Sequence, residues 1–275
     1  MILADAHTHS LFSHDGKAPR EEMARGAYEK GLSVLYQTEH FDAYSDGGTM
    51  RVRYFEDAIF SAPPYPDPPV ALPLSIEVGE MGEAFSEARE LLQRRPYEFV
   101  LGALHHLKGE KGFLSREYSS DGECRTLFAR YLDELLAAAE ETDYDSLAHM
   151  DYPLRYFYAK RGLLLRLEDY PREVEEILRA VIRRGKALEL NTATLRKGYP
   201  FLMTETLRRF REMGGTLVTV GSDAHAPEDI AFAFDRAEAA LREAGFSSYT
   251  IYQNRRPVPI PLSEGTACTA GPIGT

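Results

Sequence analysis

The amino-acid sequence predicts an α/β fold in which a parallel sheet closes into a single (β/α) barrel. Short apolar runs rich in branched residues alternate with helical patterns along the chain, which is typical of parallel sheets. The length of 275 residues suits one closed barrel better than an open doubly wound sheet. No Gly-x-Gly-x-x-Gly follows a strand-like run, so a dinucleotide-binding Rossmann site has no support.

Seven apolar runs have the length of strands and are expected to form the barrel. They cover residues 1–5, 33–36, 70–76, 99–103, 146–148, 187–190 and 216–220. Helices are expected between them, with Pro19 and Pro171 as first-turn residues and glycines at several ends. These helices cover residues 20–30, 123–141, 172–184, 201–213 and 228–244.

Composition indicates an ordinary globular protein, with 44% hydrophobic and 27% charged residues. The net charge of −11 argues against a broad surface for nucleic acid or an anionic membrane. The chain shows neither a signal-peptide pattern nor an apolar run of about 20 residues. Cys124 and Cys268 read as unrelated free thiols, so we expect a cytoplasmic protein. We expect one domain over residues 1–256 and a disordered tail over 257–275, rich in Gly, Pro, Ser and Thr.

The eight histidines are the most informative residues of the chain. All except His14 fall at or just past a strand-like run, while the run 70–76 leads into an acid, Glu77. Asp223 precedes His225 by two residues after the last run. Because the carboxyl ends of parallel barrel strands share one face, these side chains are expected to converge in one pocket.

Imidazole and carboxylate groups in this arrangement predict a metal centre. His7 and His9 are two residues apart, which places both side chains on one side of an extended segment. Each such motif alone fits a pair of surface histidines equally well, but the whole set does not. The donors suit Zn²⁺, Fe or Mn²⁺ and exceed one tetrahedral site. We therefore expect roughly two to three divalent transition metal ions with bridging carboxylates.

Several segments, in this order, resemble the polymerase and histidinol phosphatase (PHP) family. They are Asp5-Ala6-His7-Thr8-His9-Ser10, Thr38-Glu39-His40, Ser75-Ile76-Glu77-Val78-Gly79, Leu101-Gly102-Ala103-Leu104-His105, Ala148-His149, Leu188-Glu189-Leu190-Asn191-Thr192 and Gly221-Ser222-Asp223-Ala224-His225. The resemblance implies a distorted TIM-like barrel of seven βα units. This expectation agrees with the seven strand-like runs found independently.

The resemblance also implies a ligand set for three metals. In it, His7, His9 and Asp223 hold one metal, Glu77 bridges to a second held by His105 and His149, and His14, His40 and His225 hold a third. Glu80 is a rival to Glu77 as the bridging carboxylate. The family resemblance assigns no role to His106. One interpretation is that its side chain hydrogen-bonds to a metal ligand.

Metal chemistry of this kind suits phosphomonoester hydrolysis, because metals acidify bound water and neutralise charge on phosphoryl oxygens. The expected mechanism is in-line attack on phosphorus by a metal-bridging hydroxide, with Asp223 or His225 donating a proton to the leaving group. The resemblance implies that Arg155 and Arg196 bind the phosphate, with Lys160 and Arg161 as alternatives. The candidates for the rest of the substrate pocket are Phe12, Phe41, Tyr44 and Phe157 as aromatic walls and Asp42 and Asp151 as rim acids.

The expected substrate follows from charge and resemblance together. The acidic chain favours a small phosphate ester over a nucleic acid, and the resemblance implies histidinol phosphate and a place in histidine biosynthesis. Alternatives are nucleotides or other small phosphoesters, a metal-dependent amidohydrolase, and a non-catalytic binding protein. The amidohydrolase would need a different His-x-His context or a carboxylated lysine. No nucleic-acid or membrane partner is expected, and a homo-oligomer is left open.

Overall fold

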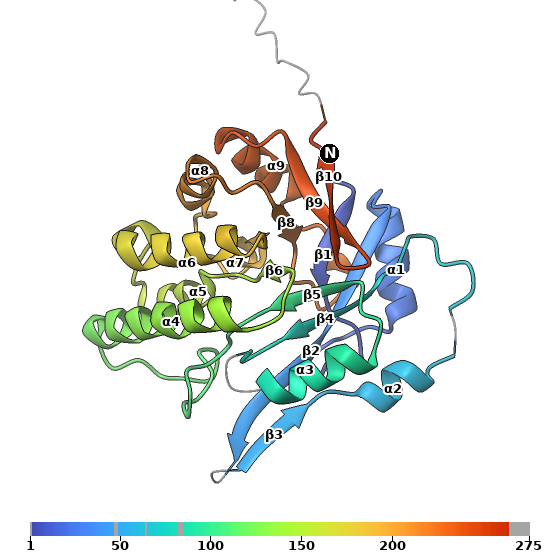
Figure 1. Ribbon diagram of the computed structural model, residues 1–275, viewed down its shortest axis with the longest axis horizontal. Helices are drawn as coiled ribbons and strands as arrows, with labels where there is room; N and C mark the ends of the chain where they lie inside the picture. The colour runs from blue at the N-terminus through green and yellow to red at the C-terminus, as the bar shows by residue number, and fades with distance from the viewer. Residues whose placement is uncertain (1, 47–48, 64, 82–84, 264–275) are drawn as a thin grey trace, which may run out of the picture.

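The barrel of the computed structural model consists of seven parallel strands that form a nearly closed ring (Figure 1). The structure describes residues 2–46, 49–63, 65–81 and 85–263. In ring order the strands are β1 (Ala4–Thr8), β2 (Val34–Asp46), β4 (Leu74–Val78), β5 (Phe99–Gly102), β6 (Ser146–Leu147), β7 (Ala187–Asn191) and β8 (Val218–Gly221). Each contains or overlaps one of the seven expected runs, so the predicted barrel is confirmed.

The ring closes between β8 and β1 at its carboxyl end. A parallel bridge joins Thr8 to Ala224. The backbone N–H of His9 donates to the carbonyl of Ala224, and that of Asp223 donates to the carbonyl of His7, both at 2.8 Å. The first and last expected ligand segments are therefore held side by side by backbone hydrogen bonds.

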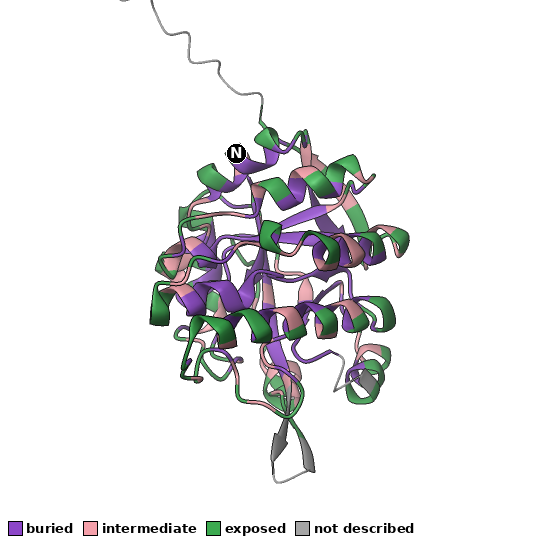
Figure 2. Cartoon of the chain, turned by 90° about the vertical axis from the view of Figure 1, so that its left-hand side faces the viewer, coloured by how far each residue is buried: buried purple, intermediate pink, exposed green. Residues whose placement is uncertain are grey.

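Helices surround the barrel and bury their apolar faces against it (Figure 2). The five expected helices are present as α1 (Arg20–Glu29), α4 (Asp121–Glu141), α6 (Pro171–Arg183), α8 (Thr204–Glu212) and α9 (Phe234–Glu243). Further helical segments were not expected: α2 (Glu56–Ser61), α3 (Phe85–Arg94), α5 (Tyr152–Arg161), α7 (Ala193–Arg196) and the turn η1 (Leu167–Asp169). The turn η2 (Pro227–Asp229) overlaps the start of the helix expected over 228–244. The expected helix over 228–244 begins late because Ala231 and Ala233 have positive φ angles of 53° and 54°.

Strand β2 is longer than the apolar run that predicted it. It continues past the barrel and pairs in antiparallel fashion with β3 (Thr49–Arg53), forming a hairpin that projects from the body (Figure 1). The register pairs Asp42 with Arg53. The polar residues after position 36 concealed this extension, because only the first part of the strand lies in the apolar interior of the ring.

A second hairpin, β9 (Ser248–Gln253) and β10 (Arg256–Pro261), packs on the amino ends of the barrel strands. The Tyr36 hydroxyl donates to the carbonyl of Tyr252 at 2.6 Å and accepts from its N–H at 3.0 Å. Tyr252 also stacks on Phe99, with ring centroids 5.1 Å apart. The hairpin thus covers the end of the barrel that is opposite to the histidines.

The expected tail requires a correction at its start. Residues 257–261 belong to β10, and Leu262 is buried, so the folded domain extends past position 256. Residues 264–275, with Cys268, lie outside the described residues. Cys124 is free and buried in α4. Among the described helices, none is long and apolar enough to cross a membrane.

Candidate metal centre

The expected ligands meet at the carboxyl end of the barrel, although more than 200 residues of sequence separate the first from the last. Each comes from the end of a strand or from the residues just after it. His7 and Glu77 lie within β1 and β4, and His105, His149 and Asp223 follow β5, β6 and β8. Three combinations of expected ligands bring three ligand atoms within 4.8 Å of one another, and a fourth combines His40 and His105 with Asp42. The predicted convergence is therefore found.

Glu77 lies at the centre of the cluster. It is completely buried, and its two carboxylate oxygens face different sets of histidines. Oε1 is 3.0 Å from Nε2 of His149, 3.3 Å from Nε2 of His105 and 3.4 Å from Nε2 of His7. Oε2 is 2.8 Å from Nδ1 of His40 and 3.7 Å from Nε2 of His9. A carboxylate in this position is suited to bridging two metals.

The rival carboxylate, Glu80, has a different environment. Its Oε1 accepts from the backbone N–H of His105 at 2.8 Å and lies 3.1 Å from Nδ1 of His106. Glu80 adopts a positive φ of 47°, an uncommon conformation outside glycine. It therefore holds the loop that carries His105, and His106 lies beside it rather than among the ligand groups.

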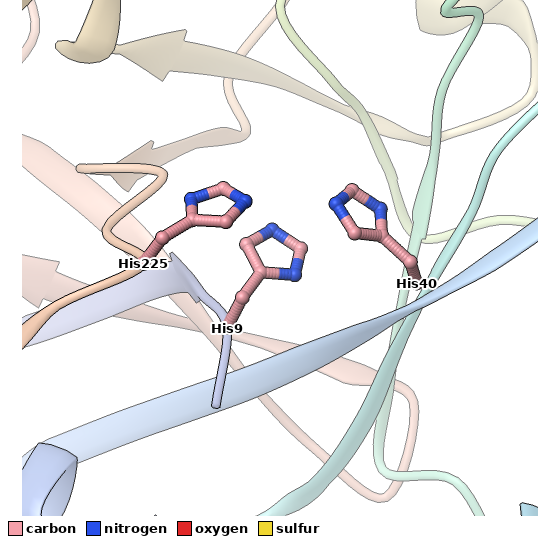
Figure 3. A group of neighbouring side chains, drawn as sticks. All are labelled: His9, His40 and His225. Carbon is pink, nitrogen blue, oxygen red and sulfur yellow. The ribbon is translucent and has the colours of Figure 1, made fainter. Parts of the chain in front are cut away.

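A second group consists of His9, His40 and His225 (Figure 3). The ring of His9 stacks between the other two, with centroid distances of 4.1 Å and 4.4 Å. The family resemblance implied that His14 joins His40 and His225, but His14 is absent from this group of described residues. Its Nδ1 instead lies 3.7 Å from Oδ2 of Asp42.

Asp15, which sequence analysis missed, takes the place expected for His14. One of its oxygens is 3.2 Å from Nε2 of His225, and the other is 3.5 Å from Nε2 of His40. The loop between β1 and α1 leaves both side chains partly exposed, His14 at 32% and Asp15 at 45%, and brings the Asp15 carboxylate within 3.5 Å of His40 and His225. Only the adjacency to His14 in the sequence could have suggested this residue.

Asp223 connects the candidate metal ligands to a cation. Its Oδ1 lies 3.6 Å from Nε2 of His9, and Oδ2 accepts hydrogen bonds from Arg155. Asp223 has a positive φ of 51°, which is strained for an aspartate and is a common feature of functional sites. A side chain on the preceding Gly221 would overlap His7 and Glu189, so this close approach of β8 to β1 and β7 requires glycine.

Glu189 is a further carboxylate to which sequence analysis gave no role. It is buried on β7, where its Oε1 lies 2.7 Å from Nδ1 of His7 and its Oε2 accepts the N–H of His149 at 2.8 Å. An acid at the outer nitrogen of a histidine fixes the ring so that the other nitrogen can bind a metal. A charged residue inside an apolar strand was the signal available in the sequence.

The cluster shifts the pKa values of its members in opposite directions. Burial favours neutral imidazole, but Glu189 and Glu77 outweigh it and raise the pKa of His7 well above its usual value. Burial together with His40 and His225 holds the pKa of His9 well below the usual value. The pKa of Glu77 is also well below its usual value, because the surrounding histidines outweigh the effect of burial.

The donor set fits transition metal ions. Several buried ligand atoms make no hydrogen bond within the described part of the chain, among them Nδ1 of His40, Oε2 of Glu77 and Nδ1 of His149. The first two are 2.8 Å apart yet lack hydrogen-bond geometry, as expected for groups that converge on a third partner. Imidazole nitrogens with carboxylate oxygens match the preferences of Zn²⁺, Fe and Mn²⁺.

The two predicted phosphate ligands lie at the edge of this cluster. Arg155 is almost fully buried, and its guanidinium lies 4.3 Å from the ring centroid of Tyr152. Arg196 donates from its terminal nitrogens to the carbonyls of Ser222 and Asp223, at 3.0 Å and 2.7 Å. Each terminal nitrogen carries two N–H groups, so Arg196 can brace the Asp223 loop and keep donors for another oxygen.

The alternative cations point away from the cluster. Lys160 donates to the carbonyl of Arg116, and Arg161 pairs with Asp121 at 3.0 Å. The first interaction ties α5 to the segment that precedes α4, and the second ties it to the first residue of α4. Neither residue is placed to bind a ligand beside Asp223.

The expected pocket walls have varied environments. Phe41 and Phe157 are buried, and Phe157 packs edge-on against Phe113 and Tyr118 in the core. The side chain of Tyr44 lies outside the described part of the structure. Asp42 faces His105, with 3.4 Å between its Oδ1 and Nδ1 of the ring. Asp151 is buried, where it accepts from Thr194 at 3.1 Å rather than facing solvent.

Comparison with known proteins agrees with this geometry. The model of the PHP domain family matches residues 5–193, and the chain belongs to this family. A probable histidinol-phosphatase of Clostridium acetobutylicum is 31% identical over 245 residues, which cover 86% of this chain and 91% of the relative. A histidinol-phosphatase of Lactococcus lactis is 25% identical over 259 residues, covering 92% and 95% of the two chains.

A solved structure has the same fold. It is the histidinol phosphate phosphatase of Lactococcus lactis in complex with zinc, L-histidinol and phosphate. The TM-score is 0.74 at 22% identity, and the alignment covers 93% of this chain and 98% of the other. The likeness confirms the TIM-like barrel as the architecture of the chain.

Proposed function

We propose that this chain is a metal-dependent phosphomonoesterase that converts histidinol phosphate to histidinol and phosphate in histidine biosynthesis. The observation that carries the proposal is the cluster of imidazoles and carboxylates around Glu77, with Arg155 held against Asp223 at its edge. Support for the substrate comes from the relatives named histidinol-phosphatase, which align with nearly the whole chain.

Three metal positions are proposed from the ligand geometry. The proposed holders are His7, His9 and Asp223 for the first, Glu77, His105 and His149 for the second, and His40, His225 and Asp15 for the third. His14 is kept as an outer neighbour of the third position, since its ring centroid lies 5.4 Å from that of His40. When bound, such metals acidify water and neutralise charge on the phosphoryl oxygens.

The residues of the chain bind the phosphoryl group and move protons. In the proposal, Arg155 and Arg196 contact phosphoryl oxygens, because guanidinium groups match their geometry. Water attacks phosphorus in line and loses a proton, and the bond from phosphorus to the histidinol oxygen breaks. That oxygen must gain a proton on leaving. Despite burial, His7 and Arg155 hold the pKa of Asp223 well below its usual value, so its ionised carboxylate can accept the proton that the water loses and return it to that oxygen.

The test compares three substrates with one preparation of enzyme. Histidinol phosphate, a dinucleotide diester and a generic phosphomonoester are assayed before and after chelation, with phosphate release as the readout. Hydrolysis of histidinol phosphate that is lost on chelation and restored by metal supports the proposal. Hydrolysis of the diester alone, or activity that survives complete metal removal, would overturn it.

Cellular location and assembly are further parts of the proposal. A cytoplasmic location is supported by the free, buried thiol of Cys124, which suits a reducing compartment. Self-association is tested by light scattering of the purified protein.

A further inference from the structure

Two histidines of the centre have an outer ring nitrogen whose partner fixes the position of the ring proton. The partner of Nδ1 of His7 is a carboxylate oxygen of Glu189 at 2.7 Å. The partner of Nδ1 of His225 is the backbone carbonyl of Asp223 at 3.1 Å. Because carbonyl and ionised carboxylate oxygens only accept, both rings carry a proton on Nδ1. Nε2 of each ring therefore faces the cluster.

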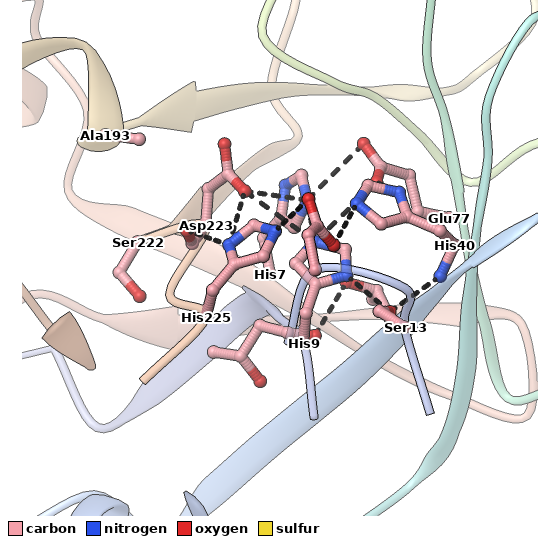
Figure 4. Close-up of polar contacts among 12 residues, drawn as sticks. His7, His9, Ser13, His40, Glu77, Ala193, Ser222, Asp223 and His225 are labelled. Atoms are coloured by element: carbon pink, nitrogen blue, oxygen red, sulfur yellow. Dashed lines mark hydrogen bonds and ion pairs between the residues drawn. The ribbon is translucent and has the colours of Figure 1, made fainter. Parts of the chain in front are cut away.

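His9 differs, because its outer partner is a hydroxyl. Nδ1 of His9 lies 3.1 Å from Oγ of Ser13 (Figure 4). A hydroxyl can donate or accept, so this contact alone permits a proton on either nitrogen of the His9 ring. A proton on Nε2 would occupy the lone pair that a metal requires.

The surroundings of Ser13 remove this ambiguity. Its hydroxyl donates to Oε2 of Glu39 at 2.6 Å, the shortest of its contacts, and the N–H of His40 donates to the same Oγ at 3.1 Å. A hydroxyl has a single proton, so Ser13 can only accept from His9. Glu39 is itself held by Ser10, whose hydroxyl donates to Oε1 at 2.6 Å. All these side chains are buried.

We propose that Glu39 is a positioning residue that acts through Ser13 to keep the proton of His9 on Nδ1 and its Nε2 free for metal. This inference rests on the proposed metal centre, but it concerns two residues that do not touch the ligand pocket.

The chemistry of the relay predicts an order of effects that loss of packing does not. In Glu39→Gln the amide keeps its oxygen toward the donors of Ser10 and turns its NH₂ group to Ser13. The serine hydroxyl is then released to donate to Nδ1 of His9, which drives the ring proton onto Nε2. In Ser13→Ala the outer partner is merely lost, and neither tautomer is imposed. Glu39→Gln should therefore be the more harmful change, although it is nearly isosteric.

The experiment measures metal release from the loaded full-length enzyme into excess chelator, together with ¹⁵N spectra of the histidine rings assigned by comparison with His9→Gln. Loss of an outer partner typically weakens metal binding about 10- to 100-fold. We expect release to be fastest for Glu39→Gln, intermediate for Ser13→Ala and slowest for the unchanged chain. The His9 ring should carry its proton on Nδ1 in the unchanged chain, on Nε2 in Glu39→Gln and on either nitrogen in Ser13→Ala.

A matched control replaces another buried carboxylate by its amide, at the opposite end of the barrel. Asp145 accepts from the N–H of Val100 at 2.9 Å, and Asp145→Asn should leave metal release unchanged. Faster release from Ser13→Ala than from Glu39→Gln, or equal release from Glu39→Gln and Asp145→Asn, would overturn the inference. If the unchanged chain holds no metal, the proposed function fails, while the ring spectra still decide the tautomer.

Discussion

Both terminal nitrogens of Arg155 donate to Oδ2 of Asp223, at 3.3 Å and 3.4 Å. The other oxygen of the same carboxylate faces His7 and His9 at 3.8 Å and 3.6 Å. A single side chain thus joins the proposed phosphate-binding cation to the proposed metal ligands. Because Arg155 is nearly completely buried, its charge is poorly screened by solvent, and a phosphoryl group beside it would be held strongly.

Replacing Arg155 or Arg196 by alanine is expected to lower kcat/KM by about 10²-fold, since a charge-assisted contact contributes about 1.5–3 kcal/mol. Metal content should stay the same, because the oxygen of Asp223 that faces the histidines is not the one bound by Arg155. Steady-state kinetics and metal analysis are measured together. Arg183→Ala, an exposed residue paired with Glu140, is the control. Unchanged kinetics in both variants would show that neither guanidinium contacts the phosphoryl group.

His9→Ala is expected to lose metal and nearly all activity while the barrel remains folded. His9 contributes to two of the groups of ligand atoms, so its loss affects more than one position. The unchanged chain should hold roughly two to three equivalents of transition metal. Elemental analysis and circular dichroism provide the two readouts. Finding a single equivalent or none after metal-replete expression of the unchanged chain would contradict the cluster.

Metal binding is expected to release protons near neutral pH. Burial lowers the pKa of His40, but Asp42 and Glu77 outweigh it and raise the pKa to about 9. The metal-free protein therefore carries a proton on His40 below that pH, and a coordinating imidazole must lose it. The number of protons released on metal binding should fall as pH rises through about 9. Calorimetric titration with zinc, in buffers of different ionisation enthalpy, measures it. Equal apparent enthalpies in those buffers near pH 7 would contradict this prediction.

Tyr36→Phe is expected to destabilise the fold by about 1–3 kcal/mol, because it leaves the buried carbonyl and N–H of Tyr252 without their partner. The effect should appear in urea unfolding of the full chain. Metal content should not change, since this contact lies at the amino end of the barrel. Tyr28→Phe is the matched control, because that ring is 61% exposed. If Tyr28→Phe lowered the free energy of unfolding as much as Tyr36→Phe, the result would argue against a stabilising role for the contact between Tyr36 and the second hairpin.

The sequence was sufficient to predict the barrel and most of the site for one physical reason. Parallel strands place their carboxyl ends on one face, so histidines that recur after apolar runs must approach one another. His149 is an example, because β6 has only two residues and still positions it beside Glu77. The roles of side chains next to these positions were harder to predict from the sequence. Whether His14 or Asp15 enters the cluster depends on the turn of one loop, and neighbouring residues in a loop have no fixed periodicity.

Prolines concealed the last strand. Pro257, Pro259 and Pro261 suggested a disordered tail, yet β10 accommodates them at alternate positions of an edge strand. Proline lacks an N–H and is tolerated where that group would point away from the partner strand. Val258 and Ile260 lie between them and face the core as partly buried side chains. The alternation of proline with branched residues was the signal for this strand.

The most direct test of the proposed activity is the ratio of kcat/KM for histidinol phosphate to that for simple phosphomonoesters of similar size, measured on the metal-loaded enzyme. The account predicts a preference well above about tenfold, which corresponds to more than ~1.4 kcal/mol of differential transition-state binding. Mutation of Arg155 should lower both values, since the phosphoryl group is common to all substrates. A ratio below about tenfold would contradict the assignment and leave a generic phosphoesterase as the better description.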